Sequence, residues 1–406
     1  MTVLYTPRGL PVTTPSAMLT SALHAFEEQV LDYGSQAAAL FEALPLDPEC
    51  ALATSYAAAL HLFRSTREGY DRARPLAQAA LRLSAASTRE QRLIEAIACW
   101  AASDVAGATA ILTEWVRREP ADLFAAKLLQ HLLFSTGDAP AMLSSILAVA
   151  AAVPDEPRVL GMLAFALDQT GRHRAAEAAA RVAVDIAPDP WAHHALAHVL
   201  DAEGRHEEGR AWMRAHADAW ATCTSFLYTH NWWHAALFHL ALGDSDGALA
   251  LYHERVWAVR KDYVQDQVNA VSLLARLELV GVDVGDRWQE IAKHVRPRRA
   301  DALDGFLDLH YAYALARAGD RAAVAELLAA LAEAAGAGDH ARQVAAKAAD
   351  GVAAFGFGDN DRAARQLEAV AQSLPLLGGS TVQRRLFHTM LSCARSGGRR
   401  ALKRAA

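Results

Sequence analysis

Two pairs of histidines, each with a spacing of four residues, are the side chains in this sequence best suited to chemistry. The first pair is His194 and His198 in "HALAH", and the second is His230 and His234 in "HNWWH". Residues four apart project from one face of an α-helix, so each pair presents two imidazoles to the same neighbour. Neutral imidazoles are ligands of zinc and other divalent transition metals. One prediction is therefore a divalent metal ion held by these four histidines.

The same imidazoles suit acid–base catalysis or the recognition of an anionic small molecule. Histidine titrates near neutral pH, and a carboxylate such as Asp266 or Asp308 can orient an imidazole and raise its basicity. His310 follows Asp308 by two residues in "FLDLH". The metal interpretation is weakened because "HNWWH" lacks the glutamate of the HExxH zinc motif. Metal binding, acid–base catalysis and anion recognition all stay open on these residues.

Other common chemistries lack their motifs in this sequence. There is no GxSxG nucleophile turn, and no GxGxxG or Walker loop, so neither a nucleotide nor a flavin cofactor is expected. Cys50, Cys99, Cys223 and Cys393 are scattered without a CxxC pair. This pattern indicates reduced thiols and a cytoplasmic protein rather than a disulfide framework.

A helical repeat must position the histidines. The segment "LAFALDQTGRH" from Leu163 matches "LAHVLDAEGRH" from Leu196 at an offset of 33 residues. Similar glycine turns recur along the chain, and an alanine-rich helix follows each of them. Helix pairs of 33 or 34 residues with glycine between the helices are typical of tetratricopeptide repeats. We therefore predict an all-α, tetratricopeptide-like solenoid, a right-handed superhelix of antiparallel helix pairs.

The polar exceptions to the repeat occupy similar positions in successive first helices. The histidine pairs precede the turn glycines Gly204 and Gly243, and His310 precedes Gly319 by a similar distance. In the unit between them, Asp262, Asp266 and Asn269 share one helical face. First helices of neighbouring repeats line the same concave wall, so these groups are expected to converge on one pocket. Trp232 and Trp233 are expected to be packing residues; the alternative is that Trp233, which lies on the same helical face as His230, forms part of the pocket wall.

The net charge and the distribution of apolar residues argue against nucleic acid and membrane as partners. The chain has 406 residues, 53% of them hydrophobic, and a net charge of −6, which disfavours a nucleic-acid partner. No run of 18 apolar residues is present, so no membrane helix is expected. We expect an irregular N-terminal segment over residues 1–16, a single solenoid domain over 17–396, and a basic, frayed tail over 397–406.

The sequence also resembles the tetratricopeptide repeat protein 38 family, from about Ser87 to Ser396. The resemblance rests on "DPWAHHALAHVLDAEGRHEEG", "HNWWHAALFHLALGDSDGALALY", "GVDVGDRW", "FLDLH" and "LGGSTVQRRLF". It departs from the family pattern at Leu307, where asparagine is expected, and at Arg385, where aspartate is expected. The resemblance implies the fold and assigns no reaction. The positions that it implies for a site are His194, His198, His230, Asn231, Trp233, His234, Asp266, Asp308, His310, Gln383 and Arg384.

The segment "GGSTVQR" has two interpretations. Ser380 followed three residues later by Gln383 is a capping box, which begins a helix. Alternatively, Gln383 and Arg384 close the end of the superhelix over the pocket, with Arg384 as a clamp for an anion. Both interpretations stay open from the sequence.

The sequence thus predicts a helical-repeat protein whose concave face binds or transforms a small polar or anionic molecule. The alternative is a scaffold that binds a peptide or a partner protein in the concave groove. Neither prediction names a reaction. The predicted catalytic residues are His194, His198, His230, His234, Asp308 and His310. The predicted ligand-binding residues are Asn231, Trp233, Asp266, Gln383 and Arg384.

Overall fold

The fold is almost entirely helical, as the sequence predicts. A computed structural model describes residues 2–336 and 338–397. Within these residues the only sheet is a two-stranded antiparallel hairpin, in which Val3 pairs with Thr13. No helix in this part of the chain has the length and apolar character needed to cross a membrane. Apart from Gly397, the predicted basic tail lies outside the described residues.

The N-terminal hairpin corrects the expectation of an irregular segment over residues 1–16. Gly9 adopts a φ of 75°, which permits the tight turn between the strands. The second strand is anchored from outside, because the backbone N–H and the hydroxyl of Thr13 donate to the Glu90 carboxylate at 2.7 and 2.6 Å. The prolines and threonines that suggested irregular structure therefore lie in and around a turn and beside an anchored strand.

The predicted glycine turns are present and have a common construction. Gly243, Gly319 and Gly358 have φ values of 79°, 79° and 84°, the left-handed conformation that ends a helix. The aspartate that follows each of them accepts a backbone N–H three residues later and so caps the second helix of the pair. One Gly-Asp dipeptide thus ends one helix and begins the next. These helix pairs make the fold tetratricopeptide-like.

The chain divides into two compact units. Unit 1 comprises residues 1–133, 139–195 and 222–224, and unit 2 comprises residues 134–138, 196–221 and 225–406. The boundary at 195/196 falls inside one helix, α11, which is continuous through it. The prediction of a single domain over residues 17–396 stays a prediction.

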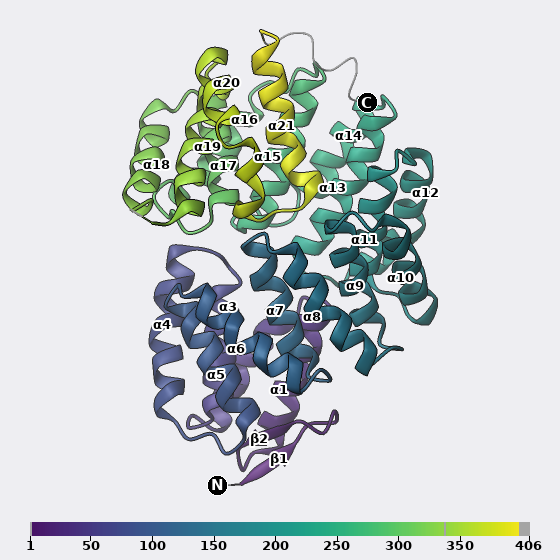
Figure 1. The fold of residues 1–406 in the computed structure, drawn as a ribbon, viewed down its shortest axis with the longest axis vertical. Helices are drawn as coiled ribbons and strands as arrows, with labels where there is room; N and C mark the ends of the chain where they lie inside the picture. The colour runs from purple at the N-terminus through teal and green to yellow at the C-terminus, as the bar shows by residue number, and fades with distance from the viewer. Residues whose placement is uncertain (1, 337, 398–406) are drawn as a thin grey trace. The chain divides into compact units, whose positions relative to one another are not determined.

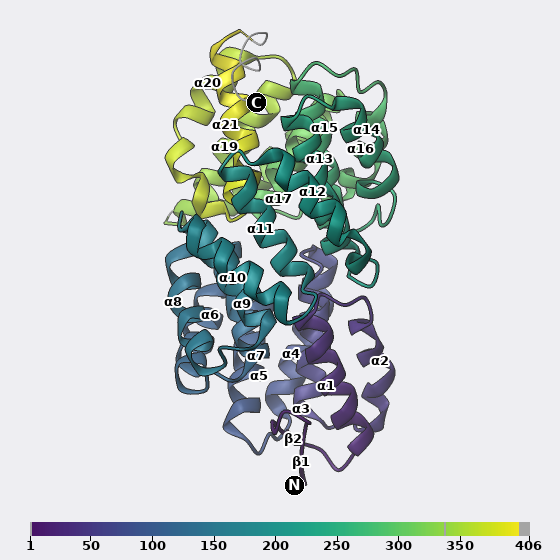
Figure 2. The same ribbon diagram turned by 90° about the vertical axis from the view of Figure 1, so that its right-hand side faces the viewer.

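Unit 1 consists of successive antiparallel helix pairs, with the hairpin at the N-terminal end of the chain (Figure 2). Its elements are β1 (Val3–Tyr5), β2 (Pro11–Thr13), α1 (Ala17–Leu31), η1 (Ala37–Ala39), α2 (Leu40–Ala43), η2 (Leu44–Leu46), α3 (Ala51–Leu62), α4 (Arg67–Arg82), α5 (Thr88–Ala101), α6 (Val105–Arg118), α7 (Leu123–Ser135), α8 (Ala139–Ala152), α9 (Pro157–Gln169), α10 (His173–Ile186) and the first part of α11 (Pro190–Ala202).

Unit 1 contains a buried ion network. Arg89 of α5 donates to Glu27 of α1 and to Asp122, both at 2.8 Å. The hydroxyl of Tyr56 on α3 donates to Glu27 at 2.5 Å, and the indole N–H of Trp115 donates to Asp122 at 3.0 Å. Burial of charge is tolerated here because each carboxylate accepts from two donors. The network connects α1, α3, α5 and α6 in the interior of the unit.

Unit 2 continues the same pattern of helix pairs. Its elements are the rest of α11, α12 (His206–His216), η3 (Ala217–Trp220), α13 (Ser225–Ala241), α14 (Ser245–Leu251), η4 (Tyr252–Val256, one π-helical turn), α15 (Val264–Leu279), α16 (Arg287–Val295), η5 (Arg296–Arg298), α17 (Gly305–Arg317), α18 (Arg321–Ala334), α19 (His340–Gly356), α20 (Asn360–Glu368), η6 (Ala371–Leu377) and α21 (Thr381–Arg395).

Within unit 2, the first helices α13, α15, α17 and α19 pack successively against one another, and α21 contacts both α15 and α19 (Figure 1). The segment 134–138 belongs to this unit because it packs on the loop before α21. A Cβ added to Gly137 would lie 1.8 Å from the carbonyl oxygen of Pro375, and one added to Gly378 would lie 2.7 Å from that of Ser135. Both glycines also have positive φ, 71° and 75°. Only glycine fits at these two positions.

Candidate functional site

The structure brings the four predicted histidines together. His194 and His198 lie one turn apart on α11, and His230 and His234 lie one turn apart on α13. All four side chains are buried, with at most 3% of any residue exposed. One nitrogen atom from each can be chosen so that the four atoms lie within 4.8 Å of one another. A space bounded by atoms so close suits an ion.

The His198 and His234 rings are tilted against each other at an interplanar angle of 57°, and the His230 and His234 rings meet edge to face. The ring centroids of His198 and His234 are 4.6 Å apart, and those of His230 and His234 are 5.0 Å apart with an interplanar angle of 83°. His234 is therefore central to the cluster, because it contacts an imidazole from each helix. The spacing of four residues on both helices produces this arrangement.

A chain of hydrogen bonds fixes the orientation of His230. Its Nδ1 atom lies 2.8 Å from the side-chain oxygen of Asn269 on α15. The Asn269 amide donates to the Thr229 hydroxyl at 3.1 Å, and this hydroxyl donates to Asp266 at 3.0 Å. Since the Asn269 oxygen can only accept, Nδ1 of His230 carries the proton and Nε2 keeps its lone pair. This is the form in which an imidazole binds a metal ion.

Aromatic rings hold His230 from both sides. The Trp233 indole lies parallel to the His230 imidazole, with centroids 5.1 Å apart and an interplanar angle of 7°. Phe226 stacks at 5.3 Å, with an interplanar angle of 26°. The guanidinium carbon of Arg276 on α15 lies 5.2 Å from a ring of Trp233. Trp233 and Phe226 thus both stack on the His230 ring.

Burial keeps two imidazoles of the cluster, those of His198 and His230, neutral. It lowers the pKa of His230 to about 4, against a smaller upward effect of the hydrogen bond to Asn269. Burial also lowers the pKa of His198 well below its ordinary value, with further lowering from His230 and Arg385. Conversely, burial raises the pKa of Asp266 to about 7, although hydrogen bonds from Thr229 and Ser225 oppose the shift. At neutral pH, His198 and His230 therefore offer lone pairs rather than positive charge.

His310 and Asp308 do not face one common space. Residues two apart on an α-helix lie about 200° apart around the axis, so their side chains leave α17 on different faces. Nδ1 of His310 donates to the Phe306 carbonyl at 2.8 Å, and its Nε2 is buried without a hydrogen-bond partner among the described residues. Burial raises the pKa of Asp308 well above its ordinary value, and the charges of Asp304 and Asp301 add to the shift. The carboxylate thus belongs to an acidic group at the start of α17.

The side chains of Gln383 and Arg384 are engaged within their own segment. Gln383 accepts the backbone N–H of Ser380 at 2.8 Å, and Ser380 accepts that of Gln383 at 3.2 Å, which completes the capping box. Arg384 donates to the carbonyl oxygens of Gly378 and Gly379 in the loop before α21. The capping-box interpretation of Ser380 and Gln383 is therefore confirmed. The remaining predicted residue, Asn231, is fully buried on α13.

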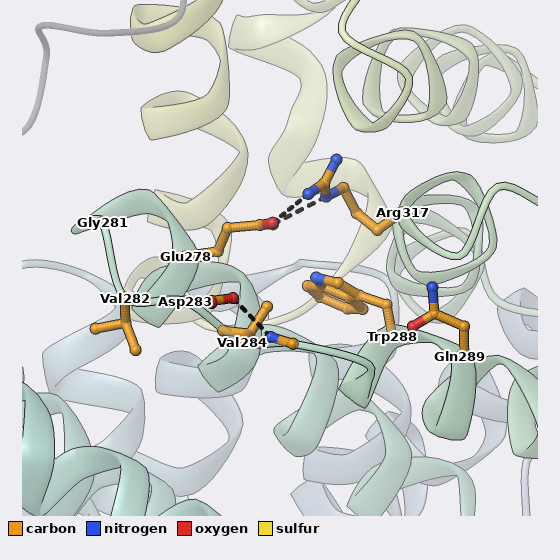
Figure 3. A pocket seen from close by; sticks show the side chains of 9 residues that line it. Glu278, Gly281, Val282, Asp283, Val284, Trp288, Gln289 and Arg317 are labelled. Atoms are coloured by element: carbon orange, nitrogen blue, oxygen red, sulfur yellow. Dashed lines mark hydrogen bonds and ion pairs between the residues drawn. The ribbon is translucent and has the colours of Figure 1, made fainter.

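A separate hollow lies on unit 2. It has a volume of about 460 Å³, and its lining residues are Glu278, Gly281, Val282, Asp283, Val284, Gly285, Trp288, Gln289 and Arg317 (Figure 3). The "GVDVGDRW" segment forms most of it, and Glu278 pairs with Arg317 at its side. None of the predicted site residues lines this hollow. The sequence marked the segment only as part of a family resemblance.

The solved structures similar to this chain share little sequence with it and superpose with TM-scores below 0.5. No family model matches the chain, so the narrower resemblance to the tetratricopeptide repeat protein 38 family stays a prediction. Similar solved structures include a Rap protein complexed with competence and sporulation factor, at 10% identity over 94% of this chain and 100% of that chain, with a TM-score of 0.44. Another is a human IFIT1 dimer with PPP-AAAA, at 14% identity over 91% of this chain and 86% of that chain, with a TM-score of 0.47. The P58(IPK) TPR domain matches at 14% identity over 96% of this chain and 100% of that chain, with a TM-score of 0.21.

Proposed function

We propose that this protein binds one divalent transition-metal ion through His194, His198, His230 and His234. The observation that carries the proposal is the convergence of four buried imidazoles, with nitrogen atoms within 4.8 Å of one another. Zinc prefers four ligands in a tetrahedral arrangement, and imidazole nitrogen is among its common ligands. A small movement of the side chains would bring all four nitrogens to bonding distance.

The surroundings of His230 support this proposal. A metal-bound histidine almost always donates its other ring N–H to a carbonyl or a carboxylate, which fixes the tautomer. His230 makes such a contact with Asn269, and Thr229 and Asp266 continue the chain. Four protein ligands leave no open coordination position, so the ion stabilises the fold rather than activating a water molecule. The protein is then a helical-repeat binding protein whose folded state is stabilised by a metal ion.

The test is metal content and thermal stability. The protein is stripped with a chelator, reloaded with Zn²⁺ or Co²⁺, and measured by elemental analysis and by the visible spectrum of the cobalt form. We expect one ion per chain, the absorption of tetrahedral Co²⁺, and a higher melting temperature with metal. At a free-ion concentration 100 times Kd, binding stabilises the folded state by about 2.7 kcal/mol.

Two variants and one control make this test specific. His234→Ala and His230→Gln should lose the ion and its effect on the melting temperature. His340→Ala removes an exposed histidine at the start of α19 and should behave like the parent. The proposal fails if the parent takes up no ion, or if His234→Ala binds the ion as tightly as the parent does. Circular dichroism establishes that each variant is folded.

The second candidate is an acid–base site for a small polar or anionic molecule. The specific observation in its favour is the hydrogen-bond chain from His230 to Asp266, whose pKa burial raises to about 7. A carboxylate that titrates near neutral pH is suited to proton transfer. In this interpretation the ligand-binding residues include Asn231, Trp233 and Asp266. It becomes the first choice if the protein takes up no ion while His234→Ala still abolishes binding of a co-purified small molecule.

The helical-repeat fold itself supports a binding or scaffold role. Stacked helix pairs present extended surfaces, and such surfaces commonly bind peptides or proteins. A scaffold does not need the buried histidines for its contacts. His234→Ala would then leave partner binding unchanged, provided that the variant stays folded.

A further inference from the structure

Unit 1 contains a second group of buried charges, which the histidine cluster does not include. Lys127 lies on α7 in the apolar stretch "LFAAKLLQHLL" and is only 7% exposed. Its ammonium nitrogen is 3.6 Å from the ring centroid of Tyr33 and 5.3 Å from that of Trp191. Nζ forms no ion pair and no hydrogen bond with the described residues. A buried ammonium group therefore contacts aromatic faces and lacks an anion.

A buried carboxylate lies close to this ammonium group. Asp189 precedes α11 and is 8% exposed. Its Oδ1 accepts the backbone N–H of Trp191 at 2.9 Å, whereas Oδ2 is buried without a hydrogen-bond partner among the described residues. The charge of Asp189 acts on Lys127 more strongly than that of Asp32, which pairs with Arg158. Lys127 and Asp189 thus influence each other without forming a contact.

Burial disfavours both charges. It lowers the pKa of Lys127 and raises the pKa of Asp189, and in each case the charge of the other residue opposes the shift only in part. A direct ion pair would remove most of this cost, but these two side chains do not form one. A molecule that carries both charges could contact both side chains at once. Such a molecule would offer a carboxylate to Lys127 and an ammonium group to Asp189.

The backbone at Tyr33 has an uncommon conformation, which positions the Tyr33 ring beside Lys127. Tyr33 has a positive φ of 53°, and its carbonyl accepts the N–H of Thr224 at 2.6 Å, beside the bridge between Gly34 and Cys223. Its ring stacks on Trp191, with centroids 4.8 Å apart and an interplanar angle of 23°. An uncommon backbone conformation that is fixed in this way often marks a functional position. Here it places an aromatic face over the ammonium group of Lys127.

A glycine makes room for the carboxylate. Gly161 lies inside α9, where alanine would be the better helix former. A Cβ at this position would lie 2.3 Å from Oδ2 of Asp189. The glycine therefore allows the unpartnered oxygen to lie against α9. In the next repeat, the position equivalent to Gly161 is His194, so this site and the histidine cluster use the same register of the repeat.

We propose that Lys127 and Asp189 bind a free α-amino acid, with Tyr33 and Trp191 against its apolar side chain. The carboxylate of the ligand contacts Nζ of Lys127, and its ammonium group contacts Oδ2 of Asp189. The aromatic faces favour an apolar or aromatic side chain. This site lies within unit 1, and its Trp191 ring contacts the ring of His194, with centroids 4.4 Å apart.

The experiment is calorimetric titration of the full chain with each of the twenty amino acids, supported by melting curves. For the amino acid that binds best, the matched analogues lack one charge; for phenylalanine these are 3-phenylpropionate and phenethylamine. We expect at least one apolar amino acid to bind and both of its analogues to bind at least tenfold more weakly. The proposal is overturned if no amino acid binds, or if either analogue binds as well as the amino acid does.

Three variants assign the binding to these residues. Lys127→Met and Asp189→Asn should each weaken binding at least tenfold, and the exposed Lys347→Met and Asp361→Asn serve as matched controls. Gly161→Ala should weaken binding through displacement of the Asp189 carboxylate, and circular dichroism checks that the variant is folded. If Lys127→Met fails to fold, Asp189→Asn and Gly161→Ala carry the test. Unchanged affinity in a folded Asp189→Asn variant would overturn the proposal.

Discussion

Nδ1 of His230 on α13 lies 2.8 Å from the side-chain oxygen of Asn269 on α15, and both residues are buried. This contact joins the first helices of two successive repeats. Replacing Asn269 with alanine should lower the affinity for zinc by about 10–100-fold, because the imidazole loses the partner that fixes its tautomer. The measurement is a competition titration with a zinc-binding dye. Asn360→Ala is the control, since the side chain of Asn360 forms no hydrogen bond with the described residues. Equal affinity in Asn269→Ala and the parent would show that the contact has no role in metal binding.

Arg89 should be among the most important residues for the stability of unit 1. Arg89→Met leaves Glu27 and Asp122 buried without their cation and should cost about 3–5 kcal/mol. Arg92→Met, on the same helix, removes only a surface pair with Glu95 at 2.8 Å and should cost about 0.2–1 kcal/mol. Urea unfolding followed by circular dichroism gives both values. Similar costs for the two variants would contradict a stabilising role of the network.

Asp308 should make stability depend on pH. Burial, followed by the charges of Asp304 and Asp301, raises its pKa well above the ordinary value in the folded state. Its contribution to stability is therefore complete below about pH 4, the ordinary range of an aspartate, and is lost as the pH rises through the folded-state pKa. Between these pH values, the free energy of unfolding falls by up to about 1.4 kcal/mol per pH unit, the value for one proton.

The corresponding measurement compares Asp308→Asn with the parent by urea unfolding between pH 4 and pH 8. The variant should lose this slope and become relatively more stable as the pH rises. Asp361→Asn, an exposed substitution on α20, should keep the pH profile of the parent. If the free energy of unfolding of Asp308→Asn changes with pH as that of the parent does, then Asp308 is not the group that holds a proton in the folded state.

Gly171 should be required for its backbone conformation alone. Its φ is 75°, and no atom lies within 4 Å of a Cβ added there. Gly171→Ala should therefore cost about 1–2 kcal/mol, the cost of a left-handed residue with a Cβ. Gly171→Asn should cost less, because asparagine tolerates this conformation better. Gly336→Ala, a site with open space and no positive φ, is the control and should change the free energy of unfolding little.

Much of the fold could be predicted because local sequence features specify the repeat. The Gly-Asp turns and the spacing of about 33 residues specify helix pairs without reference to distant contacts. The histidines also lie together as expected, since similar registers on neighbouring first helices face each other. The N-terminal hairpin was missed because its anchor, Glu90, lies on a helix far along the chain.

The rest of the site depends on contacts between helices that periodicity does not specify. Thr229 has no sequence signal of its own, because its two side-chain partners, Asp266 and Asn269, lie on the separate helix α15. Asp308 was grouped with His310 on sequence proximity, although a separation of two residues on a helix places side chains on different faces. The mutual influence of Lys127 and Asp189 had no local signal except a single lysine within an apolar helix. Its position beside Tyr33 depends on a turn held by residues 222–224.

The contact of Gly137 and Gly378 with the opposite backbone constrains how the chain acquires its fold during synthesis. The segment 134–138 leaves the ribosome early, yet its place in unit 2 is against the loop that precedes α21. Roughly 240 residues must follow before that loop exists, which at about 5–20 residues per second takes about 12–48 s. During that interval the segment lacks its partner, so the clash between a side chain at either glycine and the opposite backbone arises only at this last step. Mutations at Gly137 and Gly378 should therefore slow the completion of folding, in addition to the local strain of a positive φ.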